Sequence, residues 1–459
     1  MTDPALFGEM FAGESWSAWR ALLYGFYGLP LSDTETERFK SITGRETLPQ
    51  GLFEELWLVV GRRGGKSQTA ALLAIYLAAF QDYKDRLSPG EIATVMVLAA
   101  DRKQARSVFR YISGLIQANH MLRALVVRED RETIELSNRT VIEISTASFR
   151  SVRGYTLAAV ICDEIAFWRD TESANPDVEI LQALRPALAT LNGQLIALSS
   201  PYAKRGELYN HYRRYFGKDD PSILVAQAAS LTMNPTLPSR IVVQAMERDN
   251  ANALAEYHAQ FRSDLEAFVS REAVEACVEP GRHELPYLSV QKYRAFVDPS
   301  GGSADSMTLA IAHDERGEDQ TTTVIDAVRE VKPPFSPEAV VTDFCQLLES
   351  YHITSVTGDR YAGEWAREPF RKKGIQYELA EKPRSDLYRD ILPLINSRQI
   401  ELLDNSKLIT QLCGLERRTA RSGRDSIDHA AGSHDDIANA VAGVAVMRGP
   451  QYYDYSKLL

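Results

Sequence analysis

One stretch constrains the fold of this chain more than any other: residues 56–80, LWLVVGRRGGKSQTAALLAIYLAAF. A run of apolar and β-branched residues stops at a loop of glycine, arginine and lysine, and an Ala/Leu-rich helix former begins at once. This order predicts a strand, a tight loop and a helix. Glycines in such a loop let backbone N–H groups converge on phosphate oxygens, and the helix N-terminus adds partial positive charge. The stretch predicts a phosphate-binding loop, with an ordinary glycine-rich turn as the alternative.

The loop supplies the first set of candidate nucleotide-binding residues: Gly61, Arg62, Arg63, Gly64, Gly65, Lys66 and Ser67. Lys66 is expected to reach the β- and γ-phosphates, and Ser67 to hold Mg²⁺. The usual pattern begins with a glycine where this chain has Val60, and its first glycine comes one place later, so the loop is a variant.

A second signal is the segment 157–164, a strand of small and apolar residues that ends in Asp163 and Glu164. The carboxyl ends of parallel strands are where α/β folds bind ligands. Asp163 is expected to hold Mg²⁺ together with Ser67, and Glu164 to orient the water that attacks the γ-phosphate. The alternative for the pair alone is a solvated strand end. Combined with the loop upstream, it predicts an ATPase.

A further buried strand, residues 195–199, ends in Ser199-Ser200-Pro201. Hydroxyl groups at this sheet edge are expected to hydrogen-bond the γ-phosphate or the attacking water. The alternative is a capped turn between strand and loop.

Length and composition bound the architecture. A chain of 459 residues, 44% of them hydrophobic, predicts two or more domains. Its four cysteines lie far apart without CxxC spacing, which argues against a zinc site or a disulfide framework. The N-terminus has no basic region followed by an apolar core, and no apolar run is long enough to span a bilayer. We therefore expect a soluble, intracellular protein.

The net charge of −10 argues mildly against a protein that coats nucleic acid, but basic side chains can still gather on one face. Four local clusters exist, and each taken alone is most simply a solvated face: Arg102/Lys103/Arg106/Arg110, Arg213/Arg214, Arg371/Lys372/Lys373 and Arg417/Arg418/Arg421/Arg424.

The last third of the chain predicts a second catalytic pattern. Three strands come first, the earliest being residues 293–298 with Asp298 at its end; a helix and a fourth strand ending in Asp359 follow. Asp435 and Asp436 then open a helix. Two cations about 3.5–4 Å apart need oxygen ligands of this kind, one of them bridging. Any one of these carboxylates alone is more simply a cap or a strand end. Together they predict a metal-dependent nuclease with Asp298 as the bridging ligand.

Two further segments are less informative. Residues 202–286 show a helical pattern interrupted by prolines, which predicts a small lid or linker subdomain. Residues 415–429 read as a basic hairpin whose arginines could hold phosphates beside the cut, with an exposed loop as the alternative.

The motifs GRRGGKS, VICDE, LSSP, FVDPSGG, TGDRYAG and SHDDIANAVAG, in this order and spacing, resemble the large subunit of a tailed-bacteriophage terminase. The resemblance covers nearly the whole chain. It implies an α/β fold with an N-terminal P-loop (ASCE, RecA-like) ATPase domain and a C-terminal RNase H-like (RuvC-like) nuclease. We expect the ATPase domain over residues 1–201, a helical linker over 202–287, the nuclease over 288–447 and a tail over 448–459.

The resemblance also implies a function and partners. It implies a genome-packaging motor that translocates double-stranded DNA into a procapsid with ATP and Mg²⁺, and cuts concatemeric DNA with Mg²⁺ or Mn²⁺. Several copies would form a ring on the portal protein in the cytoplasm of the infected bacterium, guided by a small terminase subunit and absent from the mature virion. The rival is a helicase-nuclease of repair or defence, which should carry a second RecA-like domain.

Carried over residue by residue, the resemblance assigns Lys66 and Ser67 to the phosphate loop, Asp163 and Glu164 to the metal and the water, and Ser199 and Ser200 to the coupling motif. Asp298, Asp359 and Asp435 or Asp436 match the nuclease carboxylates. An arginine of the phosphate loop, Arg62 or Arg63, is also implied. So is an arginine given to the neighbour's site, for which Arg139, Arg150 and Arg153 remain candidates.

Overall fold

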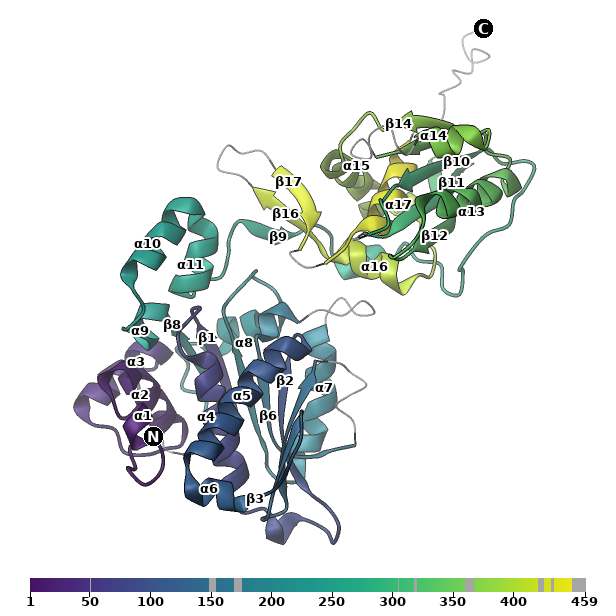
Figure 1. The fold of residues 1–459 in the computed structure, drawn as a ribbon. Helices are drawn as coiled ribbons and strands as arrows, with labels where there is room; N and C mark the ends of the chain where they lie inside the picture. Colours follow the sequence, from purple (N-terminus) through teal and green to yellow (C-terminus); the bar gives the residue numbers. More distant parts are fainter. Residues whose placement is uncertain are drawn as a thin grey trace. The chain divides into compact units, whose positions relative to one another are not determined.

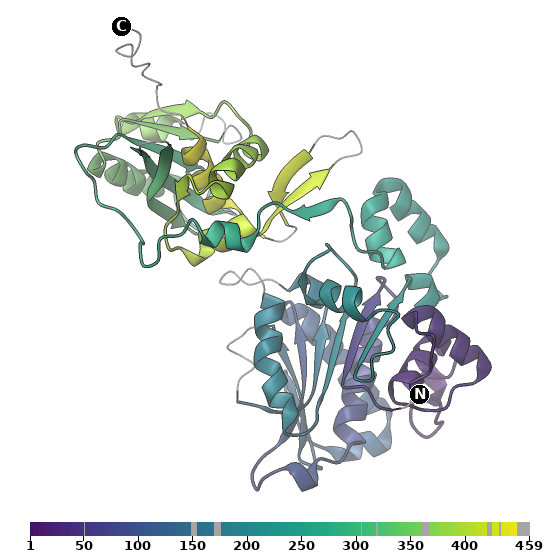
Figure 2. The same cartoon turned by 180° about the vertical axis from the view of Figure 1, so that it is seen from behind.

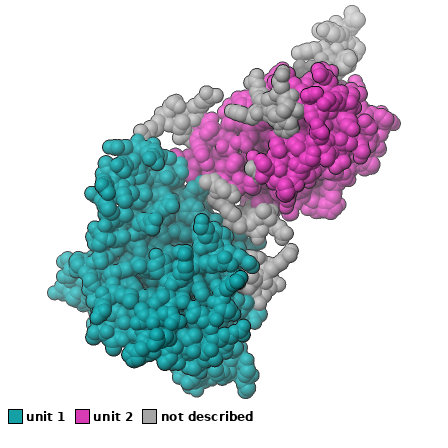
Figure 3. Space-filling model, viewed as in Figure 1, with its two compact units in different colours: residues 1–170, 175–263 teal, residues 171–174, 264–459 magenta. Residues whose placement is uncertain are grey.

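The computed structural model describes residues 1–49, 51–147, 154–168, 176–303, 305–317, 320–359, 367–419, 425–430 and 433–447. The chain divides into two compact units, one of residues 1–170 and 175–263 and the other of residues 171–174 and 264–459 (Figure 3). Each is built around its own sheet, as the length of the chain predicts. Within the described ranges, no helix is both long enough and apolar enough to cross a bilayer.

The described part of the first unit contains an eight-stranded sheet with the order β3-β4-β5-β2-β6-β7-β1-β8 (Figure 1). Six neighbouring strands, from β5 to β8, run parallel, and β3 and β4 add an antiparallel edge. The strands are β1 (Glu55–Val60), β2 (Ala93–Ala99), β3 (Val126–Glu129), β4 (Thr133–Leu136), β5 (Thr140–Thr146), β6 (Thr156–Asp163), β7 (Gln194–Ser199) and β8 (Ile223–Ala228).

Helices cover both faces of this sheet, as the alternation along β1 shows. Leu56, Leu58 and Val60 pack into one apolar core with α4 and α5, whereas Trp57 and Val59 pack into another with α7 and α8. The ribbon shows α4 and α5 on one face of the sheet and α7 on the other (Figure 1 and Figure 2). A strand buried on both faces reads as a continuous apolar run, which is how residues 56–60 appear in the sequence. The helices are α1 (Gly8–Phe11), η1 (Glu14–Trp16), α2 (Ser17–Phe26), α3 (Asp33–Thr43), α4 (Lys66–Ala79), η2 (Lys84–Arg86), α5 (Arg102–Ala118), α6 (His120–Leu125), η3 (Ile165–Phe167), α7 (Pro176–Ala189), α8 (Gly206–Tyr215), α9 (Ser230–Met233), α10 (Ser239–Arg248) and α11 (Asn250–His258).

The second unit contains a six-stranded sheet in its described part, with the order β14-β13-β10-β11-β12-β15. The first three strands in sequence, β10 to β12, are antiparallel, and β13 returns parallel beside β10. The strands of this sheet are β10 (Tyr293–Asp298), β11 (Met307–Arg316), β12 (Thr321–Val331), β13 (Ser355–Gly358), β14 (Gln376–Leu379) and β15 (Ile400–Glu401). A separate three-stranded sheet contains β9 (Leu265–Ala267), β16 (Leu415–Thr419) and β17 (Asp425–His429). This topology confirms the predicted three-strand start.

Helix α17 (Asp436–Val446) lies on one face of this sheet, and α13 (Pro337–Ser350) covers the other. The approach of α17 to β10 is close, because a Cβ atom at Gly443 would come within 2.4 Å of the Phe296 ring. The carboxylates at the start of α17 are thereby held beside the sheet edge. The remaining helices are α12 (Arg271–Glu275), α14 (Arg367–Lys372), α15 (Arg384–Asn396) and α16 (Ser406–Cys413).

Outside the main motifs, the structure confirms one sequence expectation and corrects part of another. The hairpin at residues 415–429 forms as β16 and β17, which pair antiparallel and are joined by β9. The expectation that residues 202–286 are helical holds for α8 to α12, but residues 223–228 form strand β8, which pairs with β1 along its whole length, and residues 265–267 form β9. Residues 223–228 read ILVAQA, and so short a mostly apolar segment has no period that separates a strand from a helix; only the neighbouring strand decides it.

Candidate active sites

The predicted phosphate loop joins β1 to α4, and its backbone explains the glycines. Gly65 has φ of 94°, in the left-handed region that glycine enters without steric cost, and Arg63 has φ of 64°. A Cβ atom at Gly61 would lie 2.4 Å from the hydroxyl of Ser230, and one at Gly64 would lie 2.7 Å from the Val60 side chain. The loop therefore needs its glycines, although the first of them, Gly61, stands one place later than in the usual pattern.

The loop is held by helices on either side of it in sequence. From α2, the indole N–H of Trp19 donates to the carbonyl of Gly64 at 2.8 Å. From α9, the Ser230 hydroxyl donates to the carbonyl of Arg62 at 2.6 Å. Two more contacts come from the same side: Asn234 Nδ2 donates to the Arg63 carbonyl at 2.8 Å, and the Arg62 guanidinium pairs with Glu256 of α11 at 3.2 Å. The backbone of both predicted loop arginines is thus tied to the α9–α11 helices.

Lys66 begins α4 with its side chain folded back into the loop. Its ammonium donates to the Val60 carbonyl at 3.0 Å and to the Ser200 hydroxyl at 2.9 Å, and lies 3.4 Å from Glu164 Oε1. Only 6% of the side chain is exposed. Three predicted motifs therefore meet at one cation, because β6 and β7 end beside β1 in the sheet.

Glu164 is held in place from the end of β7. Its Oε2 atom accepts hydrogen bonds from the Ser199 hydroxyl at 3.0 Å and from the Ser200 backbone N–H at 3.1 Å. Its own backbone is in the left-handed region, with φ of 51°, which is uncommon for a residue other than glycine. Strain at such a residue is typical of functional positions. Ser199 and Ser200 are predicted to bind phosphate or water. In the structure both contact Glu164, the predicted catalytic carboxylate, and Ser200 also contacts Lys66.

Asp163 fits a cation ligand. Burial raises the pKa of its carboxyl group to about 7, the charge of Glu164 acts in the same direction, and Lys66 opposes both. Its Oδ1 atom is buried and has no hydrogen-bond partner in the described part of the chain. A buried carboxylate oxygen without a donor is costly unless a cation compensates it. Ser67 follows Lys66 in the first turn of α4, and its side chain is partly buried.

The predicted trans-acting arginine has one candidate within the described residues. Arg139 lies in the turn before β5, where its guanidinium donates to the carbonyls of Ser88 and Glu91, both at 2.6 Å. That turn is at the edge of the sheet opposite the phosphate loop, because β5 runs parallel to β2 and the rest of the core. Arg150 and Arg153 lie outside the described residues.

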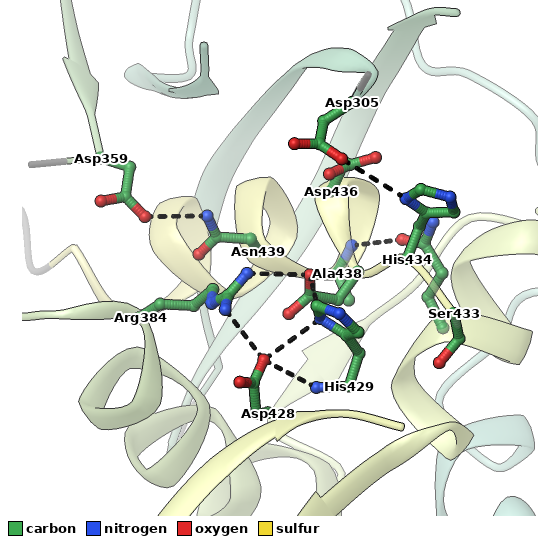
Figure 4. Close-up of polar contacts among 12 residues, drawn as sticks. Asp305, Asp359, Arg384, Asp428, His429, Ser433, His434, Asp436, Ala438 and Asn439 are labelled. Atoms are coloured by element: carbon green, nitrogen blue, oxygen red, sulfur yellow. Dashed lines mark hydrogen bonds and ion pairs between the residues drawn. The ribbon is translucent and has the colours of Figure 1, made fainter. Parts of the chain in front are cut away.

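The second site lies where β10 and β13 end side by side. Phe296 pairs with Thr357 and Val297 with Gly358, so the next residues in each strand, Asp298 and Asp359, are neighbours. The Asp359 backbone N–H donates to the Val297 carbonyl at 3.3 Å. From α17, Asn439 Nδ2 donates to Asp359 Oδ2 at 3.1 Å (Figure 4). Two strands and one helix thus bring the predicted carboxylates together.

The electrostatics of Asp298 indicate uncompensated negative charge. Burial raises the pKa of its carboxyl group to about 8 against a hydrogen bond from Asn439, and the charges of Asp359, Asp436 and Asp435 add to the rise. Carboxylates that repel one another in this way ionise readily only when a cation joins them. The donor set therefore fits a divalent cation with oxygen ligands.

Asp435 and Asp436 differ in their surroundings. Asp435 accepts hydrogen bonds from Arg384 at 3.0 Å, His429 Nδ1 at 3.1 Å and the Tyr388 hydroxyl at 2.7 Å. Burial acts to raise the pKa of Asp435, but the His429 and Tyr388 hydrogen bonds and the Arg384 charge hold it below its ordinary value. Burial raises the pKa of Asp436, and the charge of Asp435 adds to this effect. Asp436 is the less compensated of the two.

The residues around Asp435 were not predicted from the sequence. Arg384 also pairs with Asp428 at 2.8 Å (Figure 4). Asp428, His429 and Asp435 place ligand atoms within 4.8 Å of one another. A cation at those three residues would have to displace the Arg384 ion pairs. Asn439 lies one helical turn beyond Asp436 and could have been found by that spacing. Arg384 and Tyr388 lie on α15 and carry no local signal.

The arginines of the predicted basic hairpin have acidic neighbours. Arg417 Nε donates to Asp425 at 2.6 Å, and the Arg418 guanidinium lies 3.7 Å from Glu416. Arg421 and Arg424 lie outside the described residues. The described arginines are therefore partly neutralised within the hairpin.

Comparison with known proteins gives structural matches only, because no family model and no curated protein matches this chain. The crystal structure of the HK97 bacteriophage large terminase is 16% identical, with 93% of this chain and 99% of that chain covered and a TM-score of 0.40. The large terminase of a thermophilic bacteriophage, in complex with ADP, is 11% identical, with 94% and 98% covered and a TM-score of 0.41. The large terminase nuclease of the thermophilic phage G20c with bound cobalt is 15% identical, with 38% and 94% covered and a TM-score of 0.33.

Proposed function

We propose that this chain is an ATP-driven motor that moves double-stranded DNA into a viral procapsid and cuts that DNA with a metal-dependent nuclease. The observation that carries the proposal is the presence of two carboxylate sites on two separate sheets. One is built around Lys66 and Glu164, and the other where Asp298 meets Asp359. The order and spacing of the six motifs support the same function.

In the first site, the backbone of residues 61–65 and the ammonium of Lys66 would bind the phosphates of ATP. Glu164, held by Ser199 and Ser200, would orient a water for attack on the γ-phosphate. Mg²⁺ held by Ser67 and Asp163 would neutralise charge on the β- and γ-oxygens. Loss of the γ-phosphate would alter the contact of Lys66 with Ser200. Such a change could reach α9–α11, because Arg62 and Arg63 link the loop to these helices.

In the second site, Asp298, Asp359 and Asp436 would hold Mg²⁺ or Mn²⁺, which stabilises the attacking and leaving oxygens of the DNA phosphate. We propose Asp436 rather than Asp435 as the ligand from α17, because Asp435 already accepts three hydrogen bonds. Asn439 would orient Asp359, and Arg384, Tyr388 and His429 would keep Asp435 ionised beside the cluster.

The partners follow from the proposed reaction. Double-stranded DNA is the substrate of both activities, and a homo-oligomeric ring on the portal protein of the procapsid would give translocation its direction. A small terminase subunit would select the DNA, and the chain would act in the cytoplasm of the infected bacterium. The rival, a helicase-nuclease, is not favoured, because the second unit has an antiparallel three-strand start in its described sheet rather than a second RecA-like one.

Incubation of the purified full chain with supercoiled plasmid tests the proposal. With Mn²⁺ or Mg²⁺ present we expect nicked, linear and then degraded DNA. With chelator we expect no cleavage, because the proposed reaction needs a cation to stabilise the attacking and leaving oxygens. ATP hydrolysis, measured in parallel, should require Mg²⁺. Cleavage that persists in chelator, or an absence of both activities in every metal, would contradict the proposal.

A further inference from the structure

Helix α5 carries four basic side chains on its exposed side: Arg102, Lys103, Arg106 and Arg110, here named the α5 basic row. Its other side is buried against the sheet and α4 through residues such as Val108 and Ile112. Arg102, Arg106 and Arg110 are four residues apart, so they follow one another along one face at intervals of about 6 Å. We propose that the α5 basic row binds the phosphate backbone of duplex DNA.

The row is unfavourable for the helix that carries it. Arg102 and Lys103 occupy the first turn of α5, where the partial positive charge of the helix N-terminus disfavours cations. Arginines at i and i+4 repel one another, and the row contains two such pairs. The nearby carboxylate of Asp101 is used as the N-cap and accepts a hydrogen bond from the Gln104 backbone N–H at 2.9 Å. Interactions within the described part of the chain therefore do not account for four cations at these positions of α5.

The row also lacks the local compensation, by an ion pair or by a helix C-terminus, that is found in the other basic clusters. Over the part of the chain that the structure describes, none of its four side chains forms an ion pair or a hydrogen bond. By contrast, Lys372 pairs with Glu368 at 2.9 Å at the C-terminal end of α14, and Arg417 contacts Asp425. Arg213 and Arg214 lie in the last turn of α8, where the helix dipole favours cations. Among these clusters, as far as the structure describes them, the α5 basic row has neither an ion pair nor a helix C-terminus to compensate its charge, so its charge remains available to a ligand.

The chemistry of that ligand follows from the charge. The chain as a whole carries a net charge of −10, so an unpaired row of guanidinium groups is complementary to a polyanion rather than to an average protein surface. Arginine forks bind phosphate oxygens in pairs, and regularly spaced cations suit a regularly charged backbone. Duplex DNA is the polyanion that the proposed function supplies, and this inference rests on that function.

The position of the row connects it to the ATP site. Helix α5 follows β2 at the sheet edge that carries the phosphate loop, and β2 pairs with β6 up to Leu98 and Cys162. Asp163 is the next residue of β6, so α5 begins one strand away from the proposed Mg²⁺ ligand. DNA held by the row would therefore lie within reach of movements at the nucleotide site.

The test uses the full chain with both charges reversed in the double variant R106E/R110E. Binding to a nonspecific DNA duplex is measured by fluorescence anisotropy over a series of salt concentrations, with ATPase measured with and without DNA. We expect affinity at low salt to fall roughly tenfold or more, and the slope of log K against log salt to decrease by about 2. ATPase without DNA should be unchanged, because neither side chain contacts the nucleotide site. The neutral variant R106Q/R110Q should show the same change in slope.

The matched control is R123E/R131E, which makes the same change in net charge at exposed arginines of the same unit. It should bind DNA as the unchanged chain does. Equal loss of binding in both double variants, or unchanged binding in R106E/R110E, would overturn the proposal while leaving the motor and nuclease untouched. Loss of self-association by R106E/R110E with unchanged DNA affinity would also overturn the proposal, since the row would then contact another copy of the chain. Failure of the proposed function itself would appear differently, as no DNA binding and no ATPase in the unchanged chain.

Discussion

The variant Glu164→Gln should lose ATP turnover by roughly 100-fold or more while still binding nucleotide, because it lacks the carboxylate that we propose to orient the attacking water and accept its proton. Glutamine can still accept the hydrogen bonds that Ser199 and the Ser200 backbone N–H donate, so the shape of the site should be retained. Steady-state phosphate release gives the rate, and binding of a fluorescent ATP analogue gives the affinity.

The control for that variant is Glu54→Gln, an exposed carboxylate just before β1, which should hydrolyse ATP at the original rate. DNA cleavage by Glu164→Gln should also remain, because the two sites lie on separate sheets. Full ATPase activity in Glu164→Gln would remove this residue from the catalytic role.

Replacing Asp298 by asparagine should abolish DNA cleavage, by at least about 100-fold, because the carboxylate that we propose as the bridging ligand of the cations is lost. We expect this substitution to leave the fold and its thermal stability intact. Burial and three neighbouring carboxylates raise the pKa of Asp298 against the hydrogen bond from Asn439, so a neutral side chain relieves repulsion, and asparagine can still accept that hydrogen bond. Plasmid cleavage with Mn²⁺ gives the activity, and thermal unfolding in chelator should show a Tm equal to or above that of the unchanged chain.

The matched control is Asp343→Asn on the exposed side of α13, which should cut DNA normally. ATPase activity should be unchanged in both variants. If Asp298→Asn lost ATPase activity along with cleavage and kept its thermal unfolding transition, the two sites would not be separate, and the division of labour would be wrong.

The sequence predicted the parts of both sites that depend on local order. A buried strand, glycines and a helix former follow one another without a gap in residues 56–80, so the loop geometry is encoded within the segment itself. Asp298 and Asp359 end strands that the topology places next to each other, and a parallel sheet brings such ends to one edge. These predictions needed the type and order of elements but no side-chain contacts.

The contacts that hold the sites could not be predicted in this way. Ser230 and Glu256 reach the phosphate loop from helices far along the chain, and Arg384 reaches Asp435 from α15. None has a spacing or a motif that marks it, because its role depends on how the elements pack. Strand β8 was missed for the same reason, since its pairing with β1 rather than its own pattern makes it a strand.

The location of bound Mn²⁺ tests the central claim most directly. Crystals of the full chain, soaked with Mn²⁺ and an ATP analogue and measured at the manganese absorption edge, would show the cations by their anomalous scattering. We predict manganese between Asp298, Asp359 and Asp436 in the second unit, and a separate ion between Ser67 and Asp163 in the first. Manganese bound at Asp428, His429 and Asp435 instead, with no ion beside Asp298, would contradict the account of the nuclease site.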